Sequence, residues 1–510
     1  MKASKIAIAS LLAVSLLSGC AIPAAGQVAS AAKTTAASTS AASAVSYEGT
    51  KINFTDSAII ADSNDGLEID GTGLTITKSG TYLLSGKCAS GSVKVKKGTT
   101  GVTLVLQGLN LTCEDTAPIV CAKSTEVTIV AGAGTENTLA DTENNSEETG
   151  NTEAENAVIK CKDGSQVILC GTGTLTIQAV AKNGIHSGAT TQEEGEASLT
   201  IRELTLNIGA ANDAVNAQAA LNVESGNLTI SAGDDALHCD NTLNIGAAGT
   251  QGPTVTISDC NEGLEGAAVN VYSGDVNIAA ADDCINAANS ELSGFHYQIN
   301  ISGGSITAYT RTGDGFDSNG DITISGGAVA VWSANTGDNS PLDADGTVTV
   351  SGGTVLAAGG SSGMGVNLDA QQPCVIFGGD ARMGGAGLVT NGSSFTISNS
   401  GTVYSGSALC GVSCLLFSSP ELADGDSCTL SSGGSEAAAQ AQSGTVSSGR
   451  GGMGGGKIGG DRPEGQPDRD MGGGQEGQPD RDMGGRQRPE GGGSPGRPGD
   501  SPQTDSGSSV

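Results

Sequence analysis

The feature that most constrains the fold is a repeat of short strand-like segments. NISGGSITAY, TISGGAVAVW and TVSGGTVLAA begin at residues 300, 323 and 349, and their serines are 23 and 26 residues apart. Apolar and polar residues alternate in each segment, as in a strand with one buried face. Short strands at this period predict a parallel β-solenoid, because stacked coils share a core that no single coil could bury.

We therefore expect an all-β chain whose residues 51–430 form a right-handed parallel β-helix. A β-sandwich or a propeller is the alternative, but propeller blades need about 40 residues, which is longer than this period. Glycine accounts for 80 of 510 residues and aromatic residues for only 3%. That composition suits many tight corners and a core of aliphatic side chains.

A four-residue unit recurs with the strands, carrying a polar or acidic residue at positions one and four and an apolar residue at position three. Its first positions are separated by 30, 22, 27, 21 and 31 residues. The copies are 183–186, 213–216, 235–238, 262–265, 283–286 and 314–317, and a looped-out copy is expected to end at Asp343.

Stacking predicts that these units form two outward columns of side chains. Equivalent residues of successive coils lie about 4.8 Å apart. Two like charges at about 5 Å repel by about 3 kcal/mol at an effective dielectric constant of 20. A cation would offset this repulsion, and calcium takes roughly six to eight oxygen ligands.

The predicted calcium ligands are the acids of these units together with two adjacent aspartates: Asp213, Asp234, Asp235, Glu262, Glu265, Asp282, Asp283, Asp314 and Asp317. The alternative is that these side chains cap turns by hydrogen bonding to local backbone. EF-hand spacing is absent, so the predicted site would be created by stacking.

The two ends of the chain differ from its middle. The chain begins with basic residues and a short apolar run, which predict a signal peptide over residues 1–19. The sequence Leu-Ser-Gly-Cys that follows resembles a bacterial lipobox, and this resemblance implies that Cys20 is lipidated. Residues 20–50 are rich in Ala, Ser and Thr and are interpreted as a tether. Residues 431–510 are rich in Gly and Pro and are interpreted as a disordered tail. We expect a lipid-anchored monomer on the extracellular face of a bacterial cytoplasmic membrane.

Charge and cysteine content restrict the partners. A net charge of −31 argues against nucleic acid, which requires a basic surface. One of 13 cysteines is the expected lipidation site, and no CxxC pair supports zinc. The others are interpreted as buried thiols, with some disulfides as the alternative.

Several phrases resemble one known family. ITKSGTYLLSG at residue 76, VTLVLQGLNLT at 102 and PIVCAKSTEVTIVAGAGTENTLAD at 118 are similar to the carbohydrate-binding β-helix family of cellulolytic anaerobic bacteria. The resemblance implies a pectate-lyase-like fold, calcium on the acidic turns, and binding of cellulose or polygalacturonate-type polymers. His186 and His238 depart from the acidic pattern and Glu262 replaces an aspartate, so these coils are expected to lack metal.

The function expected is polysaccharide binding without catalysis. Calcium could bridge the acidic protein to an acidic polymer, whereas a neutral glucan would need an aromatic surface, for which Trp332 and Tyr309 are the candidates. A calcium-dependent polysaccharide lyase is the first alternative, with Arg311 or Lys182 as its base, although no lyase motif surrounds either residue. A structural surface adhesin is the second.

Overall fold

The computed structural model describes residues 46–189, 197–289, 292, 294–334, 339–360, 368–378 and 387–446. The expected signal peptide, Cys20, most of the tether and the tail beyond residue 446 lie outside the described residues.

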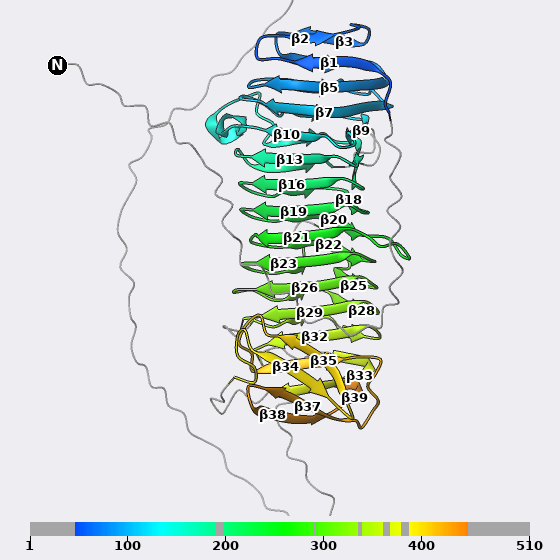
Figure 1. Cartoon of the computed structure of the whole chain (residues 1–510), viewed down its shortest axis with the longest axis vertical. Coiled ribbons are helices and arrows are strands. Elements are labelled where there is room, and N and C mark those ends of the chain that lie inside the picture. Colours follow the sequence, from blue (N-terminus) through cyan, green and yellow to red (C-terminus); the bar gives the residue numbers. More distant parts are fainter. Residues whose placement is uncertain are drawn as a thin grey trace, which may run out of the picture. The chain divides into compact units, whose positions relative to one another are not determined.

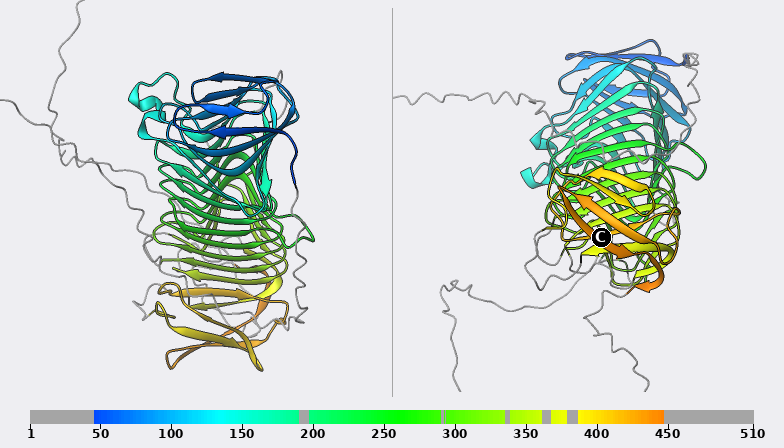
Figure 2. Two further views of the ribbon diagram at one scale, coloured as in Figure 1. Left: turned by 45° about the horizontal axis from the view of Figure 1, so that its top comes forward. Right: turned by 60° about the horizontal axis from the view of Figure 1, so that its bottom comes forward.

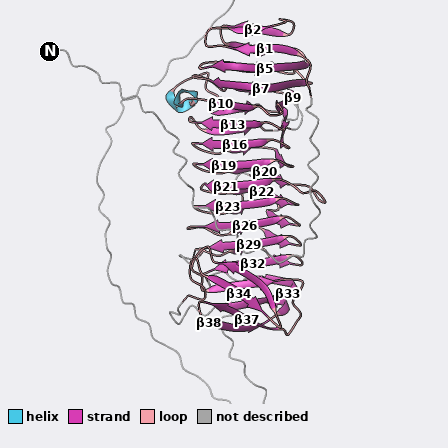
Figure 3. Cartoon of the chain, viewed as in Figure 1, coloured by secondary structure: helices cyan, strands magenta, loops and turns pink. Residues whose placement is uncertain are grey.

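Short strands that pair in parallel with the equivalent strands of the next coil dominate the described chain (Figures 1 and 3). A representative coil contains β13 (Thr174–Ala179), β14 (Asn183–Ser187) and β15 (Ser198–Ile201), which pair in parallel with β16 (Thr205–Ala210), β17 (Val215–Ala217) and β18 (Ala220–Val223). The predicted parallel β-helix is confirmed.

Each coil adds strands to three parallel sheets. The first sheet contains β10 (Glu136–Ala140), β13, β16, β19 (Asn227–Ala232), β21 (Thr254–Asp259), β23 (Asp275–Ala280), β26 (Ser305–Thr310), β29 (Ala328–Ser333) and β32 (Thr354–Gly359). The second contains β4 (Gly73–Ile76), β6 (Ser92–Val95), β8 (Ile119–Cys121), β11 (Ala157–Cys161), β14, β17, the starts of β20 (Leu237–Ile245) and β22 (Leu264–Val271), β24 (Ile285–Ala287), β27 (Phe316–Ser318) and β30 (Leu342–Ala344). The third contains β9 (Glu126–Ala131), β12 (Gln166–Gly171), β15, β18, the ends of β20 and β22, β25 (Gln298–Ile301), β28 (Asp321–Ile324), β31 (Val348–Val350) and β33 (Leu368–Gly378).

The core is a continuous column of aliphatic side chains enclosed by the three sheets. Alternation along each strand directs every second residue inward, as in β19, where Leu228 and Ile230 are buried between exposed neighbours. This packing fixes the register, since a slip of one residue would turn the apolar side chains outward.

Antiparallel strands close the N-terminal end of the solenoid. Strand β1 (Thr50–Phe54) pairs with β2 (Ile59–Ala61), and β3 (Leu67–Asp70) pairs with β4. The long strands β5 (Gly80–Cys88) and β7 (Val102–Thr112) then start the parallel pairing. The helical segments among the described residues are η1 (Glu143–Asn145) and η2 (Glu147–Thr149), and neither is long and apolar enough to cross a membrane.

Antiparallel strands also close the C-terminal end. Strand β36 (Cys414–Ser418) pairs with β32 and β33, and β39 (Gln442–Val446) pairs with β33. A separate antiparallel sheet, β35 (Thr402–Ser407), β34 (Ser394–Ser398), β37 (Ser427–Ser432) and β38 (Ser435–Gln440), lies at the same end (Figure 2). We call this sheet the C-terminal cap.

The cap corrects two predictions. Strands β38 and β39 lie beyond residue 430, where the tail was expected to begin, and residues 394–440 form antiparallel strands rather than further coils. Trp332, expected on a carbohydrate-binding surface, is only 1% exposed. Its ring packs edge-on against Phe395 of the cap, with ring centroids 5.9 Å apart, so the outward side of β29 is covered by protein.

The cysteines of the solenoid and the cap are buried thiols. The twelve from Cys88 to Cys428 are all buried and free, as the strand context of several of them predicted. Cys121 and Cys161 lie in register on β8 and β11, inside the core.

Burial of Trp332 generates a first prediction. Trp332→Ala should lower the free energy of unfolding by about 3–5 kcal/mol, because a large side chain is removed from a packed site. Trp332→Phe, which keeps an aromatic ring against Phe395, should cost less. Chemical denaturation measures both. An unfolding free energy of Trp332→Ala equal to that of the wild type would contradict the buried position.

Candidate functional site

The four-residue units form the two predicted columns at the corner between the first and second sheets. Their third residues stack in register and are buried: Ile185, Val215, Leu237, Leu264, Ile285 and Phe316. The corner column contains Asn183, Asp213, Asp235, Glu262, Asp283 and Asp314. The strand column contains His186, Asn216, His238, Glu265, Asn286 and Asp317, and it continues to Asp343 of β30.

The corner column makes backbone hydrogen bonds between coils. Asn183 Oδ1 accepts from the backbone N–H of Asp213 at 3.3 Å, and Asp283 Oδ1 accepts from the backbone N–H of Asp314 at 2.6 Å. Turn capping, the alternative to metal binding, therefore accounts for part of the pattern. Turn capping does not explain why carboxylates recur in the corner column, because the neutral amide of Asn183 accepts the same backbone hydrogen bond as the carboxylate of Asp283.

The carboxyl groups of the corner column resist ionisation. Burial, reinforced by neighbouring carboxylates, raises the pKa of Glu262 to about 8 and that of Asp283 to about 7. The same causes raise the pKa of Asp314, and of Asp317 in the strand column, to about 6. Burial is the larger cause, and the neighbouring carboxylates add the mutual repulsion that stacking predicts, which a cation would relieve.

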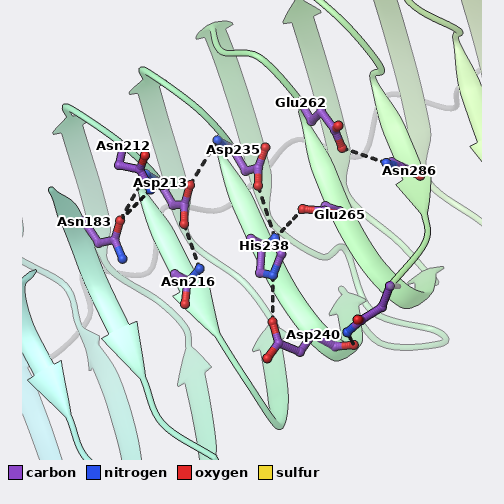
Figure 4. A network of polar contacts seen from close by, with 11 residues as sticks. Asn183, Asn212, Asp213, Asn216, Asp235, His238, Asp240, Glu262, Glu265 and Asn286 are labelled. Atoms are coloured by element: carbon purple, nitrogen blue, oxygen red, sulfur yellow. Dashed lines mark hydrogen bonds and ion pairs between the residues drawn. The ribbon is translucent and has the colours of Figure 1, made fainter. Parts of the chain in front are cut away.

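His238 supplies a positive charge at one level of the columns (Figure 4). Its Nδ1 lies 3.1 Å from Asp235 Oδ2 and also contacts Glu265, and its Nε2 lies 2.8 Å from Asp240 Oδ1. Burial lowers the pKa of His238, but hydrogen bonds to the three carboxylates outweigh it, so that the pKa is raised well above its ordinary range. The same contacts lower the pKa of Glu265 despite its burial.

Asp213, Asp234 and Asp235 form a cluster of three carboxylates that could hold a metal ion. One carboxylate oxygen from each lies within 4.8 Å of the others, and among the described residues the other such cluster is Asp235, His238 and Glu265. Three oxygen donors from two adjacent coils suit a hard cation. Sequence reasoning included all three residues, with Asp234 expected to complete the ligand shell.

Glu265 belongs to the cluster with His238, and the other predicted ligands lie further along the columns, where the described residues form no such cluster. Asn286 Nδ2 donates to Glu262 Oε2 at 2.9 Å, whereas its buried Oδ1 has no hydrogen-bond partner among the described residues. An amide oxygen is also a calcium-type ligand. Asp282 is exposed, and its charge contributes to the raised pKa of Asp283. The carboxylate oxygens and the Asn286 amide oxygen in this part of the columns are therefore also ligands that a hard cation prefers.

The basic and aromatic candidates lie apart from this cluster. Arg311 Nη2 pairs with Asp259 Oδ1 at 3.0 Å. Tyr309 is half-buried and lies in register with Trp332 beside the cap. Sequence reasoning therefore aligned the two aromatic residues correctly but could not detect the sheet that covers Trp332.

The fold and the columns together define an acidic parallel β-solenoid with a candidate site for a hard cation. The sequence profile of a family described as "Carbohydrate-binding domain-containing protein" matches residues 70–363, and the chain belongs to this family.

Two individual proteins are similar to parts of the chain. A protein of Acetivibrio thermocellus with the same description is 35% identical over 136 residues, which are 26% of this chain and 47% of that protein. The chain thus spans about half the length of this curated relative. A solved structure titled "Structure of the polysaccharide lyase-like protein from C. thermocellum, Gadolinium derivative" is 24% identical, with a TM-score of 0.33, and covers 60% of this chain and 93% of that one.

The raised pKa values generate a second prediction. A carboxyl group whose pKa is raised by folding stabilises the fold below its unfolded value, near 4, and loses that contribution as the pH rises to the folded value. In chelator, the melting temperature should therefore fall between about pH 4 and pH 8, the range over which these carboxyl groups up to Glu262 ionise, and the raised pKa of His238 adds to the fall above its unfolded value near 6.5. His186, whose pKa burial lowers to about 4, opposes this trend but is outnumbered by the acids.

Added calcium should reduce the fall at high pH, because metal binding requires deprotonated carboxylates. Glu262→Gln is the matched variant: it keeps an oxygen acceptor for Asn286 and should make the profile flatter in chelator. A melting temperature that stays constant or rises from pH 4 to pH 8 in chelator would contradict the raised pKa values of these carboxyl groups.

Proposed function

We propose that this chain is a non-catalytic polysaccharide-binding lipoprotein that holds calcium on its acidic columns and uses it to bind a pectin-like polymer. The observation that carries the proposal is the cluster of Asp213, Asp234 and Asp235, three carboxylates from adjacent coils with no basic side chain in the cluster, in a member of a carbohydrate-binding family.

Calcium suits the cluster for reasons of charge and ligand type. All three side chains offer oxygen, and backbone carbonyls at the corner could supply further ligands. His238 belongs to the same unit as Asp235, and its imidazolium already neutralises Asp235 and Glu265 on the side that faces the next coil. We therefore place the ion on the side of Asp235 that faces Asp213, away from His238.

An acidic polymer would bind through the same ion. The chain has a net charge of −31, so its surface repels polygalacturonate unless positive charge is added. When bound, calcium supplies that charge and coordination positions for uronate carboxylates. Asp234 holds the outermost position of the cluster, because Asp213 and Asp235 are the more deeply buried.

The third prediction concerns Asp234. Asp234→Asn removes one charge while keeping the size of the side chain, and it should weaken calcium-dependent retention on immobilised polygalacturonate at least tenfold. Asp70→Asn, at an exposed acid of β3 outside the columns, is the control and should behave as wild type. Equal retention of both variants would contradict the proposed ion site.

The same retention experiment distinguishes binding of the polymer from its enzymatic cleavage. β-Elimination would release unsaturated sugars that absorb in the ultraviolet, and a base would have to act beside the metal. Arg311 is instead paired with Asp259, which is why we favour binding. Calcium-dependent release of absorbing product, abolished by Arg311→Ala, would replace binding with catalysis.

The fourth prediction concerns the anchor. We propose that Cys20 is lipidated and holds the protein at the outer face of a bacterial cytoplasmic membrane. Cys20→Ser should release the protein from the membrane fraction into the medium, which immunoblotting of both fractions measures. Alanine substitution at Ser18, which keeps a small residue before the cysteine, should leave it anchored. Membrane retention of Cys20→Ser would contradict the anchor.

A further inference from the structure

The cluster of Asp235, His238 and Glu265 differs from the three aspartates in its ligand atoms. One ligand atom from each residue lies within 4.8 Å of the others. Asp235 and His238 belong to one unit, and Glu265 lies in register with His238 on the next coil. His238 Nδ1 lies 3.1 Å from Asp235 Oδ2 and also contacts Glu265 (Figure 4). One nitrogen and two carboxylate oxygens therefore meet at this level of the columns.

A fourth residue, outside this cluster, orients the imidazole. Nε2 of His238 lies 2.8 Å from Oδ1 of Asp240, on the same strand β20. A carboxylate that accepts the Nε2–H bond fixes the tautomer of a neutral imidazole, so the lone pair is on Nδ1. Nδ1 is the nitrogen that faces Asp235 and Glu265. Metal-ligating histidines have this arrangement, in which the second ring nitrogen donates to a carboxylate.

The ligand atoms select the class of metal. Calcium and magnesium take oxygen ligands, whereas imidazole nitrogen suits zinc and neighbouring transition metals. Zinc–ligand bonds of about 2.0–2.1 Å at the tetrahedral angle place two ligand atoms about 3.3 Å apart, which is close to the 3.1 Å between His238 Nδ1 and Asp235 Oδ2. The histidine that disfavours calcium on this coil therefore favours a zinc-type ion.

The surroundings of the cluster are sheltered and contain an unsatisfied polar atom. The side chains of Asp235, His238 and Glu265 are 12, 20 and 18% exposed, so an ion has access from solvent. Asn286 lies in register with Glu265 on the next coil, and its buried Oδ1 has no hydrogen-bond partner among the described residues. A buried acceptor without a donor indicates a missing partner. A water molecule bound to an ion in the cluster is a donor of the kind required.

We propose that Asp235, His238 and Glu265 bind a divalent transition-metal ion of the zinc type, with Asp240 as a positioning residue and a further coordination position left to water. The ion replaces the proton that His238 Nδ1 holds in the metal-free protein, and this proton passes to solvent. Oδ2 of Asp235 faces His238, so Oδ1 remains for calcium on the side of Asp213. The proposal requires neither calcium nor a polysaccharide.

The test is a calorimetric titration of zinc chloride into the full chain, in an excess of calcium that occupies sites made only of oxygen. The wild type should bind zinc at a site that His238→Gln lacks. Asp240→Asn keeps all three ligands but no longer orients the imidazole, and it should raise the dissociation constant about tenfold or more. His296→Gln is the control, because His296 pairs with Asp321 at 2.9 Å outside the columns, and it should bind zinc as wild type does.

Wild type that binds no zinc in excess calcium, or His238→Gln that binds it as tightly as wild type, would overturn the proposal. Asp240→Asn provides the test if His238→Gln fails to fold, because the Asp240 side chain is 37% exposed and supplies no ligand. Wild-type zinc affinity in that variant would overturn the role of Asp240. Asp234→Asn should bind zinc normally, so failure of the calcium proposal would appear with polygalacturonate and leave this experiment unaffected.

Discussion

The interaction on which the rest of the structure depends is the in-register stacking of buried apolar residues at the third position of each unit. Leu237, Leu264 and Ile285 are each 0% exposed and lie one above another. Because each is held in the core, the residues on either side of it must project at the same place on every coil. Any residue type that recurs at one position of the unit therefore forms a column of side chains along the solenoid.

A column of one residue type has different consequences for amides and for carboxylates. Asparagines can hydrogen-bond to one another without a charge penalty, as the stacked asparagines from Asn222 to Asn300 do in the third sheet. Carboxylates at the same spacing repel, and burial prevents water from screening them. At one level of the acidic columns the imidazolium of His238 provides the compensating charge. The proposed calcium would provide it between that level and the preceding coil, where Asp213 lies.

Much of this arrangement could be predicted from the sequence. The spacing of the units and the alternation of ITISGG-like segments were enough to predict the parallel solenoid, and they aligned both columns correctly because the repeat itself encodes the register. The cluster around Asp234 was within the predicted ligand set. These predictions depend on local pattern, which stacking translates directly into three dimensions.

The predictions that failed depended on contacts between distant segments. Nothing near Trp332 indicates that Phe395 will cover it, so an aromatic residue on an outward position was interpreted as a ligand surface. The strands after residue 430 lack the repeat and are rich in Ser, Gly and Ala, which resembles a linker. The contact of His238 with Asp240 was missed because Asp240 lies outside the four-residue unit.

The most direct test of the central claim is a calorimetric titration of calcium into the chelated full-length protein at pH 8. Stacked carboxylates that need a cation predict saturable binding of at least one calcium ion per chain, weakened when Asp213 is replaced by Asn. Absence of saturable binding would contradict the account, and the acidic columns would then have to be explained by turn capping alone.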